Sequence, residues 1–292
     1  MQQIQTTDSK EECNMISIMV MTKNEEMNLP GCLASIAWCD DIHLYDSYST
    51  DNTVVIAQAA GAHITQRHFD NWSAHQNWGL RNIPFKHEWV FYIDADERMT
   101  KELADHLLGI SQTSSPHAAY RLQRRDFFMG TWLKHVQASP FFMRFFKPEK
   151  MRFERLVNPI SIPDGSVGEV SGYLDHYPFS KGISQWLERH NSYSTFEAQQ
   201  IVSAADKQKF SLVKAFTAKD FSERRFHQKE LFYRLPGRPL VKFLALYLVK
   251  RGFLDGKAGF TYALLQSIYE YMIQIKTEEL RQSNSTLQTK TA

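Results

Sequence analysis

The amino-acid sequence predicts an α/β fold: a Rossmann-like, mostly parallel sheet flanked by helices, followed by a helical C-terminal extension. Two observations predict the sheet. Short apolar runs alternate with amphipathic segments over residues 16–110, and three of these runs end in a polar, acid-rich stretch. A third observation predicts the extension, because basic and aromatic residues recur at helical spacing from residue 207 onward.

The first 110 residues supply four strands and four helices in alternation. Apolar runs bounded by polar residues predict the strands, and apolar residues three or four apart predict the helices. The predicted strands are 16–21, 42–45, 62–65 and 89–93, and the predicted helices are 25–38, 50–61, 72–82 and 100–110. Gly61 is placed to end the second helix, and Thr100 is placed to cap the fourth.

The chain changes character after the fourth helix. Residues 119–128 and 140–147 are aromatic and arginine-rich and are expected to form antiparallel strands, whereas residues 152–180, rich in glycine and proline, are expected to be mainly loop. Helices are expected over 184–207, 240–251 and 258–280, with a break at Pro236-Gly237-Arg238-Pro239. The chain thus divides into a flexible leader (1–14), an α/β domain (15–205), a basic helical C-terminal region (206–280) and a disordered tail (281–292).

The bulk composition excludes some classes of protein. The 292 residues include 34 Lys+Arg and 32 Asp+Glu, a formal net charge of +2, so a globally basic nucleic-acid binder is not expected. No window supplies the roughly 20 apolar residues that span a bilayer, and residues 1–14 lack the apolar core of a signal peptide. Cys13, Cys32 and Cys39 have no metal-site spacing and fit a reducing compartment. We therefore expect a cytoplasmic protein without a nucleic-acid partner.

Polar, acid-rich clusters follow three of the predicted strands. They are Thr22-Lys23-Asn24-Glu25-Glu26, Asp46-Ser47-Tyr48-Ser49-Thr50-Asp51 and Asp94-Ala95-Asp96-Glu97. The carboxyl ends of parallel strands meet at one edge of a sheet, and open α/β sheets bind ligands outside that edge. We therefore expect the three clusters to converge on one binding site.

The Asp94-Ala95-Asp96 segment predicts a metal site. Two carboxylates one residue apart at a strand end can share a divalent cation and a diphosphate, and hard oxygen ligands suit Mg²⁺ or Mn²⁺. Such a cation stabilises the negative charge that develops on a leaving diphosphate. The alternative for an isolated motif is a solvated acidic turn, and the two companion clusters favour the metal site.

The other two clusters predict contacts with a nucleoside. The carboxylate of Asp46 can accept hydrogen bonds from a base N–H or a ribose hydroxyl, whereas helix capping accounts for residues 49–51 and leaves Asp46 unexplained. Glu25 is a second candidate for a nucleoside contact, with a place in the first turn of a helix as its alternative.

The three clusters, in this order and at these intervals, resemble glycosyltransferase family 2. The residues that carry the resemblance are Thr22-Lys23-Asn24-Glu25-Glu26, Asp46-Ser47-x-Ser49-Thr50-Asp51-x-Thr53 and Trp89-Val90-x-x-Ile93-Asp94-Ala95-Asp96-Glu97-Arg98. The chain is similar to the branch that includes the lipopolysaccharide core β-1,4-glucosyltransferases, specifically over residues 16–110 and more loosely to about residue 280. A Gly-Phe-Leu-Asp-Gly element, here at 252–256, also occurs in that branch.

The resemblance implies a GT-A fold for residues 15–205, a UDP-sugar or similar donor, and inversion at the anomeric carbon. It implies Mg²⁺ or Mn²⁺ as cofactor, with Asp96 and Asp94 as ligands. The donor-binding residues that it implies are Thr22, Asn24, Glu25, Asp46, Asp94 and Ala95. The acceptor that it implies is a saccharide or lipid-linked saccharide, in the synthesis of a lipopolysaccharide or another surface polysaccharide.

One departure from the family pattern affects the general base. Many relatives carry a His-Glu pair where this chain reads Glu154-Arg155-Leu156-Val157-Asn158-Pro159, and the glutamate of that pair is a candidate base. Direct displacement needs a carboxylate to accept the proton of the acceptor hydroxyl. The local candidates are Glu154, Asp164 and Glu169. Glu154 is preferred among them, and its alternative role is an ion pair with Arg152 or Arg155.

Histidine and aromatic residues supply further candidates. His176 can serve as a ligand of the metal or a partner of the diphosphate, or as a structural histidine. Trp72, His75, Gln76 and Trp78 can border the sugar, although core packing is the simpler explanation for the tryptophans.

The region 207–251 combines lysine and arginine with interleaved phenylalanine and tyrosine. This composition at helical spacing is typical of a segment that lies on an anionic membrane surface. An ordinary amphipathic helical subdomain is the alternative. We expect this region to contact the inner face of the cell membrane peripherally.

The sequence therefore predicts an inverting glycosyltransferase that moves a sugar from a nucleotide-sugar to a glycan or lipid-linked acceptor. A metal-dependent nucleotidyltransferase is one alternative, but residues 22–30 contain no glycine for a phosphate loop. A non-catalytic module that binds lipid surfaces or nucleic acid is the other, and the intact acidic clusters argue against it.

Overall fold

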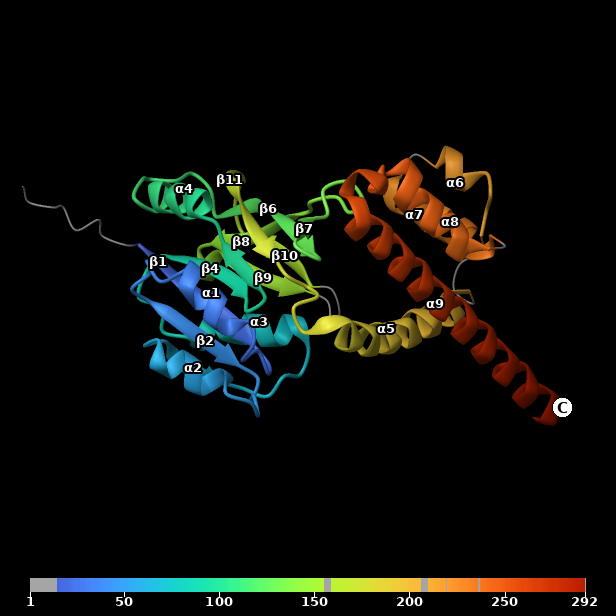
Figure 1. The fold of residues 1–292 in the computed structure, drawn as a ribbon, viewed down its shortest axis with the longest axis horizontal. Helices are drawn as coiled ribbons and strands as arrows, with labels where there is room; N and C mark the ends of the chain where they lie inside the picture. The colour runs from blue at the N-terminus through green and yellow to red at the C-terminus, as the bar shows by residue number, and fades with distance from the viewer. Residues whose placement is uncertain (1–14, 155–158, 206–209, 219, 236, 292) are drawn as a thin grey trace, which may run out of the picture. The chain divides into compact units, whose positions relative to one another are not determined.

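The computed structural model describes residues 15–154, 159–205, 210–218, 220–235 and 237–291 (Figure 1). The chain forms two compact units. The sheet unit comprises residues up to Arg125 together with Ser139–Ser180, and the helical unit comprises Asp126–Ala138 and the chain from Lys181 onward. The predicted leader, residues 1–14, lies outside the described residues.

The sheet unit has the predicted α/β fold. Its strands are β1 (Ile16–Thr22), β2 (Ile42–Asp46), β3 (His63–Gln66), β4 (Trp89–Asp94), β5 (Glu97–Met99), β6 (Ala119–Phe128), β8 (Phe141–Phe146), β9 (Met151–Glu154), β10 (Ile160–Pro163) and β11 (Val167–His176). The main sheet has the order β3-β2-β1-β4-β8-β6-β11-β5, and β9 and β10 form a separate antiparallel pair. β1 to β4 are parallel, whereas β8 runs antiparallel to β4 and to β6, as expected for residues 119–147.

Helices cover both faces of this sheet because β1 is apolar on both sides. The helices are α1 (Leu29–Ser35), α2 (Thr53–Ala59), α3 (Trp72–Asn82), α4 (Lys101–Ser111) and the short η1 (Pro148–Lys150). Side chains alternate along a strand, so Ile18 and Val20 belong to one core with Leu33 of α1, while Met19 and Met21 belong to another with residues of α3. Parallel strands buried on both faces read as continuous apolar runs, which explains the sequence pattern.

The predicted helix ends are partly confirmed. α3 has the predicted bounds, the Thr100 hydroxyl accepts a hydrogen bond from the Leu103 N–H, and Gly61 has a φ of 77° just after α2. α1 and α2 begin later than expected. Their predicted first turns instead form polar loops, in which the backbone N–H of Glu25 donates to Thr53 and that of Glu26 donates to Asp51.

The expectation of loop over residues 152–180 is wrong, because this segment contains β9, β10 and the ten residues of β11. The glycines that suggested loop occupy turns and a close approach. Gly165, with a φ of 142°, lies between β10 and β11, and Gly172, with a φ of 100°, leaves no room for a Cβ beside the Leu103 backbone. Glycine therefore permits this strand to pack on α4.

The helical unit contains the expected extension. Its elements are the short strand β7 (Thr131–Trp132), which pairs with the end of β6, and α5 (Gly182–Ala205), α6 (Lys214–Thr217), α7 (Phe221–Arg234), α8 (Arg238–Leu244), η2 (Ala245–Val249), η3 (Gly252–Asp255) and α9 (Gly256–Thr291). Across the described residues, no helix combines the length and apolar character needed to cross a membrane.

Two domain boundaries differ from those drawn from the sequence. α5 belongs to the helical unit, so the boundary follows Ser180 rather than residue 205. The reason is packing on α9: the Lys276 ammonium donates to the Asn191 carbonyl at 2.6 Å and to the Ser194 hydroxyl at 2.8 Å. Residues 281–291, expected to be disordered, continue α9, because this stretch has no glycine or proline to end the helix.

Candidate active site

The ends of four parallel strands form the edge that holds the candidate site. In the register of the sheet, Met21 of β1 is paired with Asp94 of β4, Thr22 with Asp46 of β2, and Asp46 with Gln66 of β3. The three acidic clusters therefore meet at one edge, as their positions after the strands predict. Parallel register alone produces this convergence, because every strand ends at the same level.

Asp46, the last residue of β2, is hydrogen-bonded to the ends of β1 and β3 and to the loop that follows β2. Its buried carboxylate accepts hydrogen bonds from the Thr22 hydroxyl at 3.0 Å, the Ser49 N–H at 2.9 Å and the Gln66 amide at 2.9 Å. Burial alone would raise the pKa of Asp46, but these hydrogen bonds hold it below its usual value. Asp46 is thus an ionised anchor for the loop after β2.

Asn24 and Glu25 lie in a loop that is bonded to the loop after β2. The Asn24 N–H donates to the Ser49 hydroxyl at 2.8 Å, and the Asn24 side-chain oxygen accepts from the Thr50 N–H at 2.8 Å. The Glu25 carboxylate accepts from the Asn28 amide at 2.7 Å. Asn24 adopts a φ of 55°, a left-handed conformation that asparagine tolerates better than most residues. The loops after β1 and β2 are therefore joined by hydrogen bonds and form one wall of the candidate site.

Asp94 and Asp96 have different surroundings although they are one residue apart. Asp94 accepts a hydrogen bond from the Tyr92 hydroxyl at 2.6 Å, and its other oxygen is 2.6 Å from the Arg144 guanidinium. Asp96 instead has its carboxylate 3.3 Å from Nε2 of His176, the last residue of β11. The two carboxylates therefore contact different residues: Asp94 contacts Tyr92 and Arg144, whereas Asp96 contacts His176.

Arg144 of β8 and Glu97 of β5 form a buried ion pair behind Asp94. The Arg144 guanidinium lies 2.9 Å from the Glu97 carboxylate and stacks over the Tyr92 ring at 4.1 Å. Burial raises the pKa of Glu97, while Asp94 and Glu97 together raise the pKa of Arg144 well above its usual value against the effect of burial. Arg144 therefore stays charged and fixes the orientation of Asp94.

Asp96 and His176 are the residues at this edge that could hold a divalent cation. Both side chains are partly accessible, and the Tyr177 N–H donates to the Asp96 carbonyl at 2.9 Å, which ties the two segments together. In the described ranges no cluster of three or more His, Cys, Asp or Glu side chains is arranged to hold a metal. Mg²⁺ sites of this class often use one or two protein ligands and take phosphate oxygens and water for the rest.

A cavity of about 330 Å³ lies beside Asp94. Its lining combines an acid, two arginines and several aromatic rings: Trp72, Gln76, Tyr92, Asp94, Arg124, Phe142, Met143, Arg144, Phe153, Pro159 and Ser161. Trp72 and Gln76 thus reach the cavity, whereas the buried His75 stacks on Tyr45 with ring centroids 4.2 Å apart. A cavity with aromatic walls and a few charged groups suits a sugar, which presents hydroxyls at its edge and C–H groups on its face.

The three candidate bases lie outside this cavity. Phe153 and Ser161 are paired in the β9–β10 register and both line the cavity, so the neighbouring Glu154 projects from the opposite face and contacts Arg152 at 3.2 Å. Asp164 is exposed just after β10. The assignment of the base among these candidates stays a prediction.

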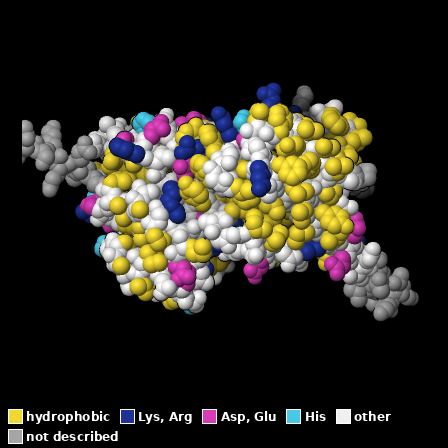
Figure 2. Space-filling model, viewed as in Figure 1, with side chains coloured by type: hydrophobic (Ala, Val, Ile, Leu, Met, Phe, Trp, Pro, Cys, Tyr) yellow, Lys and Arg dark blue, Asp and Glu magenta, His cyan; other side chains and the backbone are white. Residues whose placement is uncertain are grey.

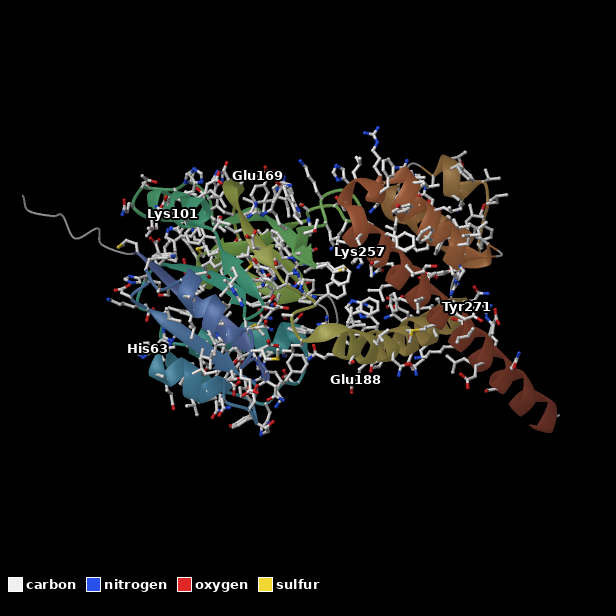
Figure 3. All side chains as sticks on the ribbon, in the orientation of Figure 1. His63, Lys101, Glu169, Glu188, Lys257 and Tyr271 are labelled. Atoms are coloured by element: carbon white, nitrogen blue, oxygen red, sulfur yellow. The ribbon has the colours of Figure 1, made fainter. Side chains whose placement is uncertain are left out.

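Glu169 lies far along β11 from the acidic edge. This residue of β11, labelled in Figure 3, is exposed and forms an ion pair with Arg121. It lies seven positions before His176 on the same strand, or roughly 20 Å at the rise of a β-strand.

Arg144, Tyr92 and Glu97 contribute to the site in roles that were not predicted from the sequence. A signal for Arg144 was present, since an arginine in the apolar run Phe141-Phe142-Met143-Arg144-Phe145-Phe146 must find a buried partner. The partner could not be predicted, because Glu97 is remote in the sequence and its strand β5 is separated from β8 by β6 and β11 in the sheet order.

Comparisons with known proteins identify the family of the chain. Residues 17–174 match the family described as Glycosyl transferase family 2. The chain is 26% identical over 271 residues to the lipopolysaccharide core biosynthesis glycosyltransferase LpsC of Rhizobium meliloti (strain 1021), covering 89% of this chain and 91% of LpsC. Among solved structures, S. aureus TarS 1–349 in complex with UDP-GlcNAc is similar with a TM-score of 0.40 and 15% identity, covering 92% of each chain. Glucosyl-3-phosphoglycerate synthase from Mycobacterium tuberculosis, in complex with Mn²⁺, UDP and glucosyl-3-phosphoglycerate, is similar with a TM-score of 0.34 and 21% identity, covering 39% of this chain and 45% of the synthase.

Proposed function

The chain belongs to glycosyl transferase family 2, and on that premise we propose that it is an inverting glycosyltransferase that uses a UDP-sugar donor. The observation that supports this proposal most is the convergence of Thr22, Asp46 and Asp94 at one sheet edge, beside a cavity of about 330 Å³. A nucleotide-sugar needs such an arrangement, with a polar wall for the nucleoside and an adjoining pocket for the sugar.

The wall formed by residues 22–25 and 46–50 is the proposed nucleoside site. Asp46 already accepts three or more hydrogen bonds from the protein, so its proposed role is to hold the loop in shape as well as to face the nucleoside. Thr22, Asn24 and Glu25 supply the remaining polar groups of the wall. Ala95 is buried in the apolar core, and its place among the donor-binding residues stays a prediction.

Asp96 and His176 are the proposed holders of Mg²⁺ or Mn²⁺. When bound, the cation neutralises the charge of the diphosphate and so makes the nucleotide a better leaving group. Asp94, fixed by Arg144 and Tyr92, is proposed to face the ribose and the sugar rather than to share the metal equally with Asp96. From the sequence, Asp94 was expected both to bind the donor and to be a second ligand of the metal beside Asp96.

Inversion is proposed because one direct displacement reverses the configuration at the anomeric carbon. A retaining double displacement needs a free carboxylate placed as nucleophile. Among the described residues that line the cavity, Asp94 is the one carboxylate, and its two oxygens are engaged by Tyr92 and Arg144. Deprotonation of the acceptor hydroxyl by Glu154, Asp164 or Glu169 belongs to the same proposal.

The proposed acceptor is a saccharide or lipid-linked saccharide of a cell-surface glycan. The support is the similarity to LpsC, a lipopolysaccharide core biosynthesis glycosyltransferase, over 91% of its length. A lipid-linked acceptor would be held at a membrane surface, and we propose that the enzyme meets it there as a peripheral protein.

A donor screen tests the proposed function. Purified protein is incubated with a saccharide acceptor, with a panel of UDP-, GDP- and dTDP-sugars and with Mn²⁺, Mg²⁺ or EDTA, and nucleotide release is measured. The proposal requires release of UDP from at least one UDP-sugar, dependent on the cation, and a product whose anomeric configuration by NMR is opposite to that of the donor. Retention of configuration would contradict the inverting assignment.

A further inference from the structure

α8 and the short helical segments η2 and η3 that follow it expose large apolar side chains. Leu240, Leu248 and Val249 are 62%, 53% and 80% exposed, and Leu244, Phe253 and Leu254 are also exposed. Leu240, Leu244 and Leu248 recur every four residues, which places them along one side of a helix. We call the exposed apolar side chains of residues 240–254 the apolar face. Monomeric soluble proteins seldom leave such contiguous apolar surface without a partner.

α9 extends this surface. Phe260, Leu264 and Ile268 recur every four residues along α9, and all three are exposed. The two helices are joined by ring contacts, since Phe260 lies 5.7 Å from Phe243 and 5.5 Å from Tyr247 between ring centroids. Figure 2 shows hydrophobic side chains gathered over the helical unit, with isolated lysine and arginine side chains among them.

The charged residues of the segment that carries the apolar face are nearly all basic. Between residues 239 and 268 the sequence contains Lys242, Lys250, Arg251 and Lys257 but a single acid, Asp255. Lys250, Arg251 and Lys257 are exposed, and Lys257 is labelled at the start of α9 in Figure 3.

Asp255 does not balance these cations at the surface. It is buried, and its carboxylate accepts hydrogen bonds from the backbone N–H groups of His135 at 2.9 Å and Val136 at 2.8 Å. It also lies 2.6 Å from Nδ1 of His135. The carboxylate of Asp255 is therefore hydrogen-bonded inside the unit, and the charged side chains that residues 239–268 expose are Lys250, Arg251 and Lys257.

We propose that the apolar face docks onto a bilayer that contains anionic phospholipid, with its apolar side chains at the acyl boundary and Lys250, Arg251 and Lys257 on lipid phosphates. Apolar side chains flanked by cations are the pattern of interfacial membrane segments, and each cation near an anionic leaflet strengthens binding. A second copy of the chain fits less well, because a symmetric contact would bring like charges together. This surface is separate from the proposed active site. By docking there, the enzyme would lie on the membrane that carries a lipid-linked acceptor.

Flotation of the full chain with vesicles tests the proposal. Vesicles of phosphatidylglycerol and phosphatidylcholine are compared with vesicles of phosphatidylcholine alone, at low and high salt. The protein is expected to float with the anionic vesicles and to bind them more weakly as salt rises, because surface charges are screened. Absence of binding to anionic vesicles at low salt would overturn the proposal.

Three variants assign the binding to this surface. Val249→Glu and the double variant Lys250→Glu/Arg251→Glu are each expected to weaken binding about tenfold or more, because they place negative charge against an anionic leaflet. Val55→Glu changes a valine that is 62% exposed on α2 of the sheet unit, and it is expected to bind as the wild type does. Equal binding by all the variants would overturn the assignment.

Two further measurements separate docking from misfolding and from self-association. Thermal unfolding and cation-dependent UDP release in solution are expected to be unchanged in Val249→Glu, because the residue is exposed and lies outside the proposed active site. Loss of vesicle binding together with normal UDP release would support a docking role. A wild-type dimer by sedimentation that Val249→Glu dissociates, without vesicle binding by either protein, would assign the face to a second copy and overturn the membrane proposal.

Discussion

The Asp96 carboxylate lies 3.3 Å from Nε2 of His176. This contact joins the turn after β4 to the last residue of β11, and the Tyr177 N–H to Asp96 carbonyl hydrogen bond reinforces it. A carboxylate and an imidazole at this separation can turn toward a common cation. The proposed metal site therefore depends on β11 reaching the edge where β1, β2 and β4 end.

His176→Gln tests whether the imidazole is a ligand. If it is, the Mn²⁺ concentration that gives half-maximal UDP release is expected to rise about tenfold or more, because one of two protein ligands is lost. His106→Gln, which alters an exposed histidine of α4, is expected to keep the wild-type Mn²⁺ dependence. An unchanged Mn²⁺ curve for His176→Gln would make His176 a structural residue.

Arg144→Met is expected to destabilise the protein strongly. The substitution leaves Glu97 buried without its closest cation and frees Asp94 from its anchor, which by analogy with other buried pairs costs about 3–5 kcal/mol. Urea denaturation followed by circular dichroism measures this cost. Arg121→Met, which breaks the exposed pair with Glu169, is expected to cost about 1 kcal/mol or less. Similar losses for the two variants would contradict the buried-anchor role of Arg144.

The stability of the protein is expected to fall as the pH drops from about 7.5 to 5. Burial, with the nearby Arg67 guanidinium, lowers the pKa of His75 from 6.5 to about 4. Below pH 6.5 the unfolded chain therefore binds a proton that the folded protein excludes, and stability is lost toward the folded pKa, by about 1–2 kcal/mol at pH 5.

Urea midpoints measured across this pH range check the effect of His75. His75→Phe, which keeps a ring beside Tyr45 but cannot titrate, is expected to have a shallower pH dependence than the wild type. His106→Gln serves as the control for the loss of one exposed histidine and is expected to retain the wild-type slope. Identical slopes for His75→Phe and the wild type would rule out His75 as the source.

Three matched variants test the general base: Glu154→Gln, Asp164→Asn and Glu169→Gln. Glu154→Gln is expected to lower kcat more than it alters donor KM, because Glu154 stands at the position where many relatives carry their candidate base. Asp164→Asn and Glu169→Gln are expected to leave kcat near the wild-type value, because neither residue occupies that position and both side chains are exposed. An unchanged kcat in all three variants would direct attention to Asp94.

The sequence predicts most of the sheet edge but not what supports it. The strands β1, β2 and β4 are recognisable because each is an apolar run that ends in a polar turn, and parallel pairing then brings Thr22, Asp46 and Asp94 together. These features are local, and the parallel arrangement follows from the alternation of strands and helices.

The contacts that distinguish Asp94 from Asp96 are not local. Arg144 approaches Asp94 from β8, and His176 approaches Asp96 from β11. β11 was expected to be loop because its glycines resemble turn signals, whereas Gly172 in fact permits close packing on Leu103. Long-range pairing and the packing role of a glycine leave no periodic signal in a single sequence.

Calorimetric titration of UDP into the wild type and Asp96→Asn, with and without Mn²⁺, tests the central claim most directly. The claim is that Asp96 holds a cation that binds the diphosphate of the donor. Wild-type protein is expected to bind UDP much more tightly with Mn²⁺ than with EDTA, and Asp96→Asn is expected to lose that enhancement while keeping the wild-type unfolding temperature. Enhancement by Mn²⁺ that is undiminished in Asp96→Asn would contradict the claim.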